Sequence, residues 1–320
     1  MKRAAGLDVR ALRMFEAVAS GGSLSTAARQ LGVTQSAVSQ ALSQIEAILE
    51  TPVFDRSQRP FKLTPAGIAL SRRARLIVDD MDRLVAHVRD ADLASRPAIR
   101  VGMIDSFAAT AGPAIVKKIT NSASQVLLWS GLANSHAQAL LNRQLDLIVT
   151  SDTLDDMDHI VRRSIFTEPF IIVAARNRAE EFEGADLNAL VSSQPLIRFS
   201  ARSHFGAMIE RYLRRNGHSP RPYLEMDSSD VVMAMVAADL GWTITTPLCL
   251  MQGRSYMPQL ATFPLPGAPL ARTIHQLSRQ GEYEEMAENC FQVSRNVLET
   301  EIFPVVRSLV PWLRNGISLS

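Results

Sequence analysis

A run of short polar side chains between residues 35 and 43 has a spacing that places them together. If the segment is helical, five of them share one face: Gln35, Ser36, Ser39, Gln40 and Ser43. That face carries no charge and almost no bulk, whereas a merely solvated face usually carries Lys and Glu. Amides and hydroxyls near a helix N-terminus can read base edges in a major groove, and glutamine pairs bidentately with adenine. The pattern favours base reading over its alternative, the polar outer face of an ordinary helical domain.

Two helices joined by a tight turn would hold this face in place. Ser23 can cap the first helix, and Gly32 can end it because glycine adopts a left-handed backbone at little cost. Thr34 can cap the second helix, whose apolar residues step by four, three and four: Val38, Leu42, Ile45 and Leu49. Such a pair predicts a helix-turn-helix. A preceding helix, capped by Asp8 and ended by Gly21 and Gly22, would complete a small domain.

A basic segment follows the second helix. Residues 52–56 and 59–67 are typical of two short strands around a turn, a wing, whose cations would contact phosphates or a minor groove. Residues 1–96 carry 14 Lys and Arg against 10 Asp and Glu, so the basic excess lies beside the helix-turn-helix. The predicted DNA contacts are Ser25, Thr34, Gln35, Ser36, Ser39, Gln40, Arg56, Arg59 and Lys62.

These motifs resemble the N-terminal domain of LysR-type transcriptional regulators. The resemblance is dense across about residues 7–70 and is carried by residues 12–19, 22–23, 27–28, 34–39, 54–56 and 63–67. Ser36 stands where the family commonly has proline, and Glu50-Thr51-Pro52 replaces a usual Leu-Gly step. Neither departure removes a base-reading residue, although the Ser36 hydroxyl would alter base preference.

A long helix is predicted from Pro65 to about Asp92, capped by Thr64. Its apolar residues recur every 3.5 positions, the period of a coiled-coil seam: Leu70, Ala74, Ile77, Met81, Leu84 and Val88. Such a helix is about 40 Å long, more than a domain this small can bury, which favours dimerisation over packing on its own domain. A dimer would present two recognition helices to a palindromic site. The resemblance implies the same dimer, often assembled further into a tetramer.

After Pro97 the pattern changes to alternating strands and helices. Strands are predicted at residues 99–104, 126–129, 145–149, 165–174, 195–199, 223–226 and 242–245, and helices between most of them, the first at 107–120. This alternation predicts parallel sheets covered on both faces. The resemblance implies two α/β lobes of the periplasmic-binding-protein type, joined by two crossover strands. The tail predicts an amphipathic helix that packs on its own lobe or on a neighbouring subunit.

The predicted chain is therefore an α+β multidomain protein. Its divisions are a winged helix-turn-helix (1–64), a dimerisation helix (65–92), a hinge (93–97), a two-lobed effector-binding domain (98–302) and a C-terminal extension (303–320). Within the effector-binding domain, the resemblance places lobe one at 98–163 plus 272–302 and lobe two at 166–266.

Ligands of open parallel sheets bind beyond the carboxyl ends of the strands, and this rule selects loops. The candidate effector contacts are Asp105, Ser106, Phe107, Ser130, Asn134, Thr150, Phe199, Ser200, Arg202, Ser203 and Thr246. The resemblance implies a small effector, commonly a carboxylate, which Arg202 would bind if it points into the cleft. Asp105 would favour a hydroxyl or an amine on the same ligand. Helix capping is the alternative for Ser106, Asn134 and Ser203.

Catalytic and metal motifs are missing from the sequence. There is no Gly-x-Ser-x-Gly, no phosphate-binding Gly-rich Lys loop and no His-Glu-x-x-His, and the six histidines are scattered. The two cysteines, Cys249 and Cys290, predict buried hydrophobes rather than a disulfide or a redox pair. No enzyme activity, metal or cofactor is expected. Without an apolar stretch of about 20 residues or a secretory signal, a membrane span is not expected either, and the predicted location is cytoplasmic.

The sequence thus predicts a DNA-binding regulator whose C-terminal cleft binds a small-molecule effector that changes the geometry of the oligomer on a promoter. Its partners would be palindromic double-stranded DNA, the effector and further copies of the chain, with RNA polymerase as a candidate. One alternative is a regulator without an effector, controlled by a protein partner or by concentration. A more remote one is a solute-binding or enzymatic C-terminal half with a docking module that does not bind DNA.

Overall fold

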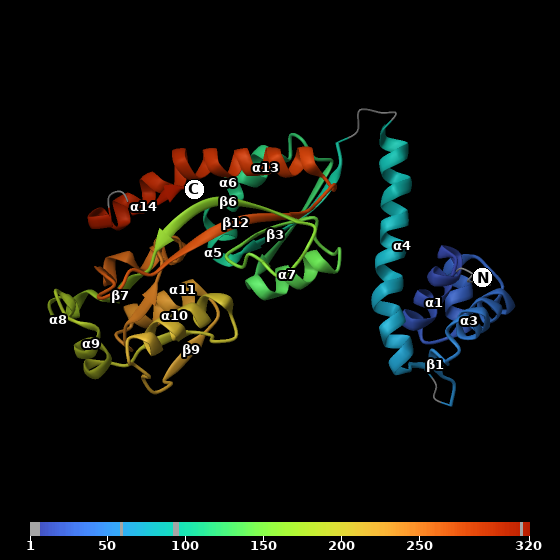
Figure 1. Ribbon diagram of the computed structural model, residues 1–320, viewed down its shortest axis with the longest axis horizontal. Helices are drawn as coiled ribbons and strands as arrows, with labels where there is room; N and C mark the ends of the chain where they lie inside the picture. Colours follow the sequence, from blue (N-terminus) through green and yellow to red (C-terminus); the bar gives the residue numbers. More distant parts are fainter. Residues whose placement is uncertain (1–6, 58–59, 92–95, 314–315) are drawn as a thin grey trace. The chain divides into compact units, whose positions relative to one another are not determined.

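The computed structural model describes residues 7–57, 60–91, 96–313 and 316–320, together with their side chains except those of residues 79, 83 and 86–91. The chain divides into two compact units, residues 1–95 and 96–320. Figure 1 shows both, with the first unit in blue and cyan.

The first unit begins with three helices, α1 (Val9–Gly21), α2 (Leu24–Leu31) and α3 (Gln35–Leu49). Their predicted caps are confirmed: carboxylate or hydroxyl oxygens of Asp8, Ser23 and Thr34 accept hydrogen bonds from backbone amides of the first turns, at 2.6, 3.2 and 3.2 Å. The helices α1 and α2 end at glycines with a φ of 66°, Gly22 and Gly32, a conformation that costs glycine little. Helix ends and turns in this unit therefore follow from local residues.

The wing forms as predicted. Strand β1 (Phe54–Asp55) pairs antiparallel with β2 (Lys62–Leu63). Helix α4 (Pro65–Ala91) follows, and the Thr64 hydroxyl accepts from the Gly67 amide at 3.0 Å. A Cβ at Gly67 would lie 2.0 Å from the Val53 carbonyl oxygen, so only glycine allows this close approach of helix and wing.

The predicted seam of α4 is divided between two environments. Ala74 is fully buried against the helices of its own unit and is therefore not free to make the contact with a second chain that the sequence pattern predicted. Leu70 is half-buried and packs partly on the same core. The reason is that α1 crosses the first half of α4 and covers that part of the stripe. Further along, three residues remain exposed: Ile77, Met81 and Leu84, at 46, 38 and 54%. The Val88 side chain lies outside those described.

The first lobe of the second unit is a six-stranded sheet in the order β13-β6-β12-β5-β3-β4. Its strands are β3 (Ala98–Ile104), β4 (Gln125–Gly131), β5 (Leu147–Thr150), β6 (Ile160–Pro169), β12 (Ala271–Arg279) and β13 (Ser318–Leu319). The helices of this part of the chain are α5 (Asp105–Thr110), α6 (Gly112–Ile119), α7 (Ala133–Leu141) and α13 (Glu284–Val297). The single helix predicted at 107–120 is therefore two helices.

The second lobe contains a three-stranded sheet, β10-β7-β11, and a pair of parallel strands, β8 and β9. A bridge between Leu196 and Trp242 links the two sets. The strands are β7 (Ile171–Ala175), β8 (Ile197–Phe199), β9 (Leu224–Met226), β10 (Thr243–Thr245) and β11 (Leu260–Pro264). The α-helices are α8 (Ala179–Phe182), α9 (Leu187–Ser193), α10 (His204–Arg215), α11 (Ser229–Ala237) and α12 (Pro247–Gln252), and short 3₁₀ turns cover 176–178 and 254–259.

Two expectations about these sheets were wrong. The sheets are mixed rather than parallel, because the strands that pass between the lobes return antiparallel to their neighbours: β12 pairs with β5 and β6, and β7 pairs with β10 and β11. The apolar run at 165–174 is also two strands in different sheets, separated at Phe170. Its first part belongs to lobe one, since Ile165 and Phe166 lie in that core.

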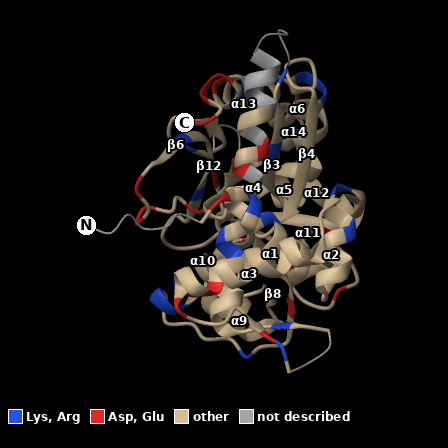
Figure 2. Ribbon diagram, turned by 90° about the vertical axis from the view of Figure 1, so that its right-hand side faces the viewer, with Lys and Arg blue, Asp and Glu red and all other residues tan. Residues whose placement is uncertain are grey.

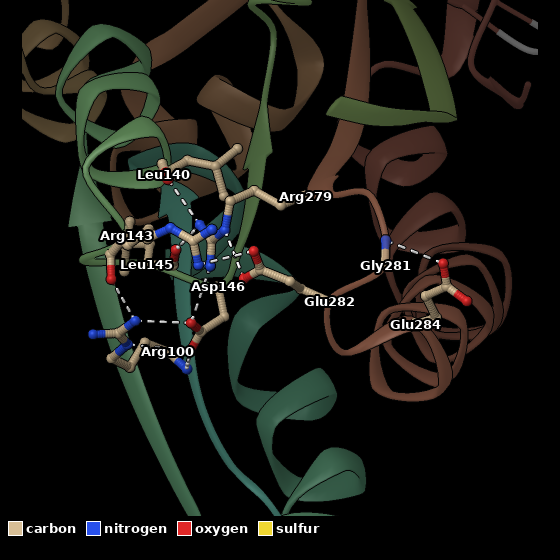
Figure 3. Close-up of polar contacts among 9 residues, drawn as sticks. All are labelled: Arg100, Leu140, Arg143, Leu145, Asp146, Arg279, Gly281, Glu282 and Glu284. Atoms are coloured by element: carbon tan, nitrogen blue, oxygen red, sulfur yellow. Dashed lines mark hydrogen bonds and ion pairs between the residues drawn. The ribbon is translucent and has the colours of Figure 1, made fainter. Parts of the chain in front are cut away.

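A buried ion cluster holds lobe one together at the end of the sheet opposite the β3 and β5 C-termini (Figure 3). Asp146, 2% exposed, accepts hydrogen bonds from Arg100 at 2.8 Å and from Arg279 at 3.4 Å. Arg279 also donates to the Leu140 and Leu145 carbonyls, each at 2.7 Å. These bonds join the starts of β3 and β5 to the end of β12, so the cluster anchors the sheet.

Candidate functional site

The predicted base-reading face lies on the surface of the first unit. Gln35, Ser36 and Gln40 are exposed and Ser39 is half-buried, while Val38, Leu42 and Ile45 on the other face of α3 are buried. Helix α3 contains no Lys or Arg and a single acid, Glu46. Figure 2 colours the basic and acidic residues of the chain. The exposed face therefore offers amide and hydroxyl groups, which donate and accept hydrogen bonds but do not select for a charged partner.

Two further predicted DNA contacts, Ser25 on α2 and Thr34 at the cap of α3, are exposed beside this face. In the wing, Lys62 is exposed, whereas Arg56 forms an ion pair with Glu46, with 2.6 Å between Nη2 and Oε2. Arg59 lies outside the described residues. Because Arg56 is 54% exposed, its ion pair with Glu46 is weakly held and a phosphate can compete for it.

A cavity of about 50 Å³ lies between the two lobes of the second unit. Loops after β3, β4 and β5 form one side of it, and residues of the second lobe form the other. Its lining is Ile104, Asp105, Ser106, Gly131, Leu132, Ala133, Ser151, Phe199, Ser203, His204, Phe205, Asp227, Ser229, Cys249 and Arg272. Four predicted effector contacts are among them: Asp105, Ser106, Phe199 and Ser203.

The floor of the cavity contains a buried ion pair that the sequence did not indicate. The Arg272 Nε donates to the Glu168 Oε1 at 2.8 Å, and both side chains are at most 3% exposed. Arg272 Nη2 also donates to the hydroxyls of Thr246 at 3.0 Å and Ser106 at 3.3 Å. The guanidinium carbon lies 4.6 Å from the Phe205 ring centroid. Arg272 therefore joins the crossover strands to both lobes.

The other predicted effector contacts lie away from the cavity. Phe107 is a core residue stacked on Phe166, and Ser130 is exposed on the edge strand β4. Thr150 and Ser200 are buried outside the lining, and Thr246 reaches the cavity only through Arg272. Ser130 and Thr150 lie within the last residues of β4 and β5, and the others follow strand ends, as predicted. None of these side chains lines the cavity.

The condition placed on Arg202, that it points into the cleft, is not met, and its alternative, a solvated loop charge, fits its position. It is exposed and does not line the cavity, so it gives no support to an acidic effector. Instead its carbonyl accepts a hydrogen bond from the Asn134 amide at 2.7 Å, which links the two lobes. A second link joins Ser151 Oγ to His204 Nδ1 at 3.2 Å. The capping alternative holds for Ser203, whose hydroxyl accepts from the Gly206 amide at 2.9 Å.

Burial lowers the pKa of three histidines of the second unit, His136, His204 and His275. A pKa below the unfolded value of about 6.5 means that the folded state resists protonation, so stability is present above that pH and lost as the pH falls. We expect the melting temperature of the second unit to fall as the pH is lowered from about 7.5 to about 5, because the unfolded chain takes up protons on these histidines more readily than the folded unit does.

The variant His136→Leu should flatten this dependence, because His136 is the most buried of the three. The exposed His159→Asn serves as control. If the melting temperature falls equally steeply with pH in wild type and in His136→Leu, His136 does not contribute to this dependence.

The described residues contain no cluster of three or more His, Cys, Asp or Glu that could hold a metal ion. Both cysteines are buried thiols, and burial raises the pKa of Cys290 to about 12. None of the helices described is long and apolar enough to cross a membrane.

Comparison with known proteins matches both units to one family. Residues 9–68 match the bacterial regulatory helix-turn-helix protein of the lysR family, and residues 94–297 match the LysR substrate binding domain. The regulator CbbR of Rhodospirillum rubrum is 28% identical over 298 residues, covering 88% of this chain and 94% of CbbR. The regulator CzcR of Bacillus cereus is 28% identical over 243 residues, covering 74% of this chain and 80% of CzcR.

Solved structures share the fold. Full-length CbnR complexed with its target DNA matches with a TM-score of 0.64 at 19% identity, covering 91% of this chain and 99% of CbnR. An OxyR mutant of Corynebacterium glutamicum with bound H2O2 matches with a TM-score of 0.56 at 21% identity, covering 98% and 97%. The winged helix-turn-helix, the two-lobed second unit and the matches over residues 9–68 and 94–297 together show that this chain belongs to the LysR family of DNA-binding transcriptional regulators, which are not enzymes.

Proposed function

We propose that this regulator binds a palindromic promoter site through the exposed face of α3. The observation that carries the proposal is the uncharged run of exposed amides and hydroxyls at the N-terminus of that helix. Gln35 and Ser39 would read base edges, while Lys62 and the wing would contact phosphates and set the register. Because a regulator of this kind must reach the chromosome, we propose that it is cytoplasmic.

Replacing Gln35 by alanine should weaken binding to the specific site by about 1–3 kcal/mol and relax the preference at one base pair. Binding to unrelated duplex should change little, because phosphate contacts supply that affinity. Footprinting and titration of a site library would measure both.

Gln30→Ala is the matched control, since Gln30 is an exposed glutamine that faces a groove between α1 and α4. An unchanged footprint in both Gln35→Ala and Ser39→Ala would exclude base reading by this face.

The cavity between the lobes is the proposed effector site. Its two sides come from different lobes, so a ligand there would have a different affinity for open and closed arrangements and would shift the population between them. A small carboxylate remains the proposed effector class, held by the Ser106 hydroxyl beside Arg272. Lobe movement would then change subunit geometry on the promoter, where RNA polymerase is a further proposed partner.

The competing proposal is a regulator that needs no effector. A thermal-shift screen of metabolites separates the two, because a ligand at about 100 times its Kd stabilises the protein by roughly 2.7 kcal/mol. A stabilising compound should lose its effect in Ser106→Ala. The absence of any stabilising compound would favour control by a partner or by concentration.

A further inference from the structure

The chain continues beyond the part matched to the family's substrate-binding domain, which ends at residue 297. Helix α13 passes through a π-helical turn, Leu298–Ile302, into α14 (Phe303–Leu309). A 3₁₀ turn (Pro311–Leu313) and strand β13 follow. Single π turns within helices are uncommon and frequently mark functional positions. This tail packs against the second unit of its own chain, one of the two positions predicted for the C-terminal extension.

The tail first joins the core of lobe one. Phe303 is 2% exposed and Val306 is fully buried in that core. The Phe303 ring lies edge-on to Phe166, with 5.8 Å between centroids. Because Phe166 lies near the end of β6, the tail packs beside the strand that leads into the first crossover at Phe170.

The tail then reaches lobe two. Val310 is fully buried in the core of that lobe, and Leu313 packs against the same core. The Trp312 indole Nε1 donates to the Thr262 hydroxyl of β11 at 3.1 Å. Leu309, the last residue of α14, packs against both cores. A movement that separates the lobes at this point would expose apolar side chains to water.

Finally the tail returns to lobe one. Strand β13 pairs antiparallel with β6, with Ser318 opposite Thr167 and Leu319 opposite Phe166. The Ser320 amide donates to the Ile165 carbonyl at 3.1 Å. The start and the end of the tail thus pack on lobe one, beside the crossover strand β6. Its middle part packs on lobe two.

We propose that the tail, residues 303–313 and 316–320, acts as a brace, a third chain segment that contacts both lobes besides the two crossovers, and that this brace sets the resting opening of the cleft. Its lobe-one anchors lie beside the crossover strand β6 and its lobe-two anchor lies on β11, so the tail holds both lobes next to the crossover. Loosening the lobe-two anchor widens the range of lobe angles. The brace is a property of the second unit and does not depend on which effector binds, or on whether one does.

The test measures the distance between the lobes in the full-length protein. Spin labels are placed at Asp156→Cys in lobe one and Arg221→Cys in lobe two, both exposed positions, while the native cysteines are buried. Double electron–electron resonance is then recorded without ligand or DNA. The brace variant is Trp312→Ala with Leu313→Ala. Its distance distribution is expected to broaden and to gain a population shifted by several ångströms.

Ser308→Ala is the control, because Ser308 is exposed on α14 and its hydroxyl donates to the Val305 carbonyl of its own helix. Thr262→Val removes the lobe-two hydroxyl that accepts the hydrogen bond from Trp312, and it should broaden the distance distribution to a smaller extent. If the double variant melts at a lower temperature but keeps the wild-type distribution well below that temperature, the tail only covers a core and the proposal is overturned. If the double variant does not fold, an unchanged distribution in Thr262→Val overturns it. Neither result bears on DNA reading or effector binding.

Discussion

Glu168→Ala is expected to destabilise the second unit by about 3–5 kcal/mol, a loss typical of breaking a buried ion pair from one side. Arg272 would stay buried with its charge uncompensated, and the Leu248 amide, which donates to Glu168 at 2.9 Å, would lose its acceptor. In a unit of this size the melting temperature should fall by roughly 6–20 °C. Calorimetry of the full-length protein measures the loss.

Two comparisons make this result interpretable. Glu168→Met combined with Arg272→Met should recover most of the stability, because no unpaired charge remains in the core. Glu301→Ala, which removes an exposed ion pair with Lys118, should change the free energy of unfolding by less than about 1 kcal/mol. Equal losses in Glu168→Ala and Glu301→Ala would show that the buried pair is not what holds the crossover.

Leu84→Glu is expected to lower the affinity for a palindromic duplex by about 10²–10⁴-fold, the gain that linking two binding modules provides. Leu84 is 54% exposed in the single chain and continues the apolar stripe of Ile77 and Met81. In a dimer with α4 against α4, the substitution would place like charges together in an apolar seam. Affinity for a duplex carrying one half-site should stay unchanged.

Sedimentation of the free protein and titration of both duplexes measure these effects. Leu84→Met keeps the volume and the apolar character of the position, so it should remain dimeric. Wild-type affinity of Leu84→Glu for the palindrome, with an unchanged sedimentation coefficient, would mean that this part of α4 is not the dimer contact.

Much of the first unit could be read from its residues because its signals are local. A cap such as Thr34 acts on amides two or three positions away, and Gly32 ends its helix through its own backbone conformation. The apolar face of α3 follows from a 3.6-residue period. Such interactions need no knowledge of distant segments, and the caps, the helices and the wing were all predicted correctly.

The exposed face of α3 is a partial exception. Its residues are predictable from spacing, but their exposure depends on where α1 and α2 pack against α3. The division of the α4 seam shows this dependence. The 3.5-residue period predicted one continuous contact, yet Ala74 is buried within its own unit while Leu84 is exposed. The period of the apolar residues shows that one side of the helix is apolar, but it does not show which segment covers that side.

The residues that line the cavity could not be predicted from local patterns, because they meet only in the tertiary structure. Arg272 and Glu168 are 104 residues apart and lie inside strands, so a rule that selects loops after strands could not find them. Arg202 obeys that rule but points to solvent, and the tail crosses from one core to another through contacts that no local pattern encodes. The sequence by itself determined the helix-turn-helix, its wing and the alternation of strands and helices, because caps, turns and periodicity act over a few residues. Which charges pair, which stripes are covered and what lines the cleft depend on segments that meet only after the chain has folded.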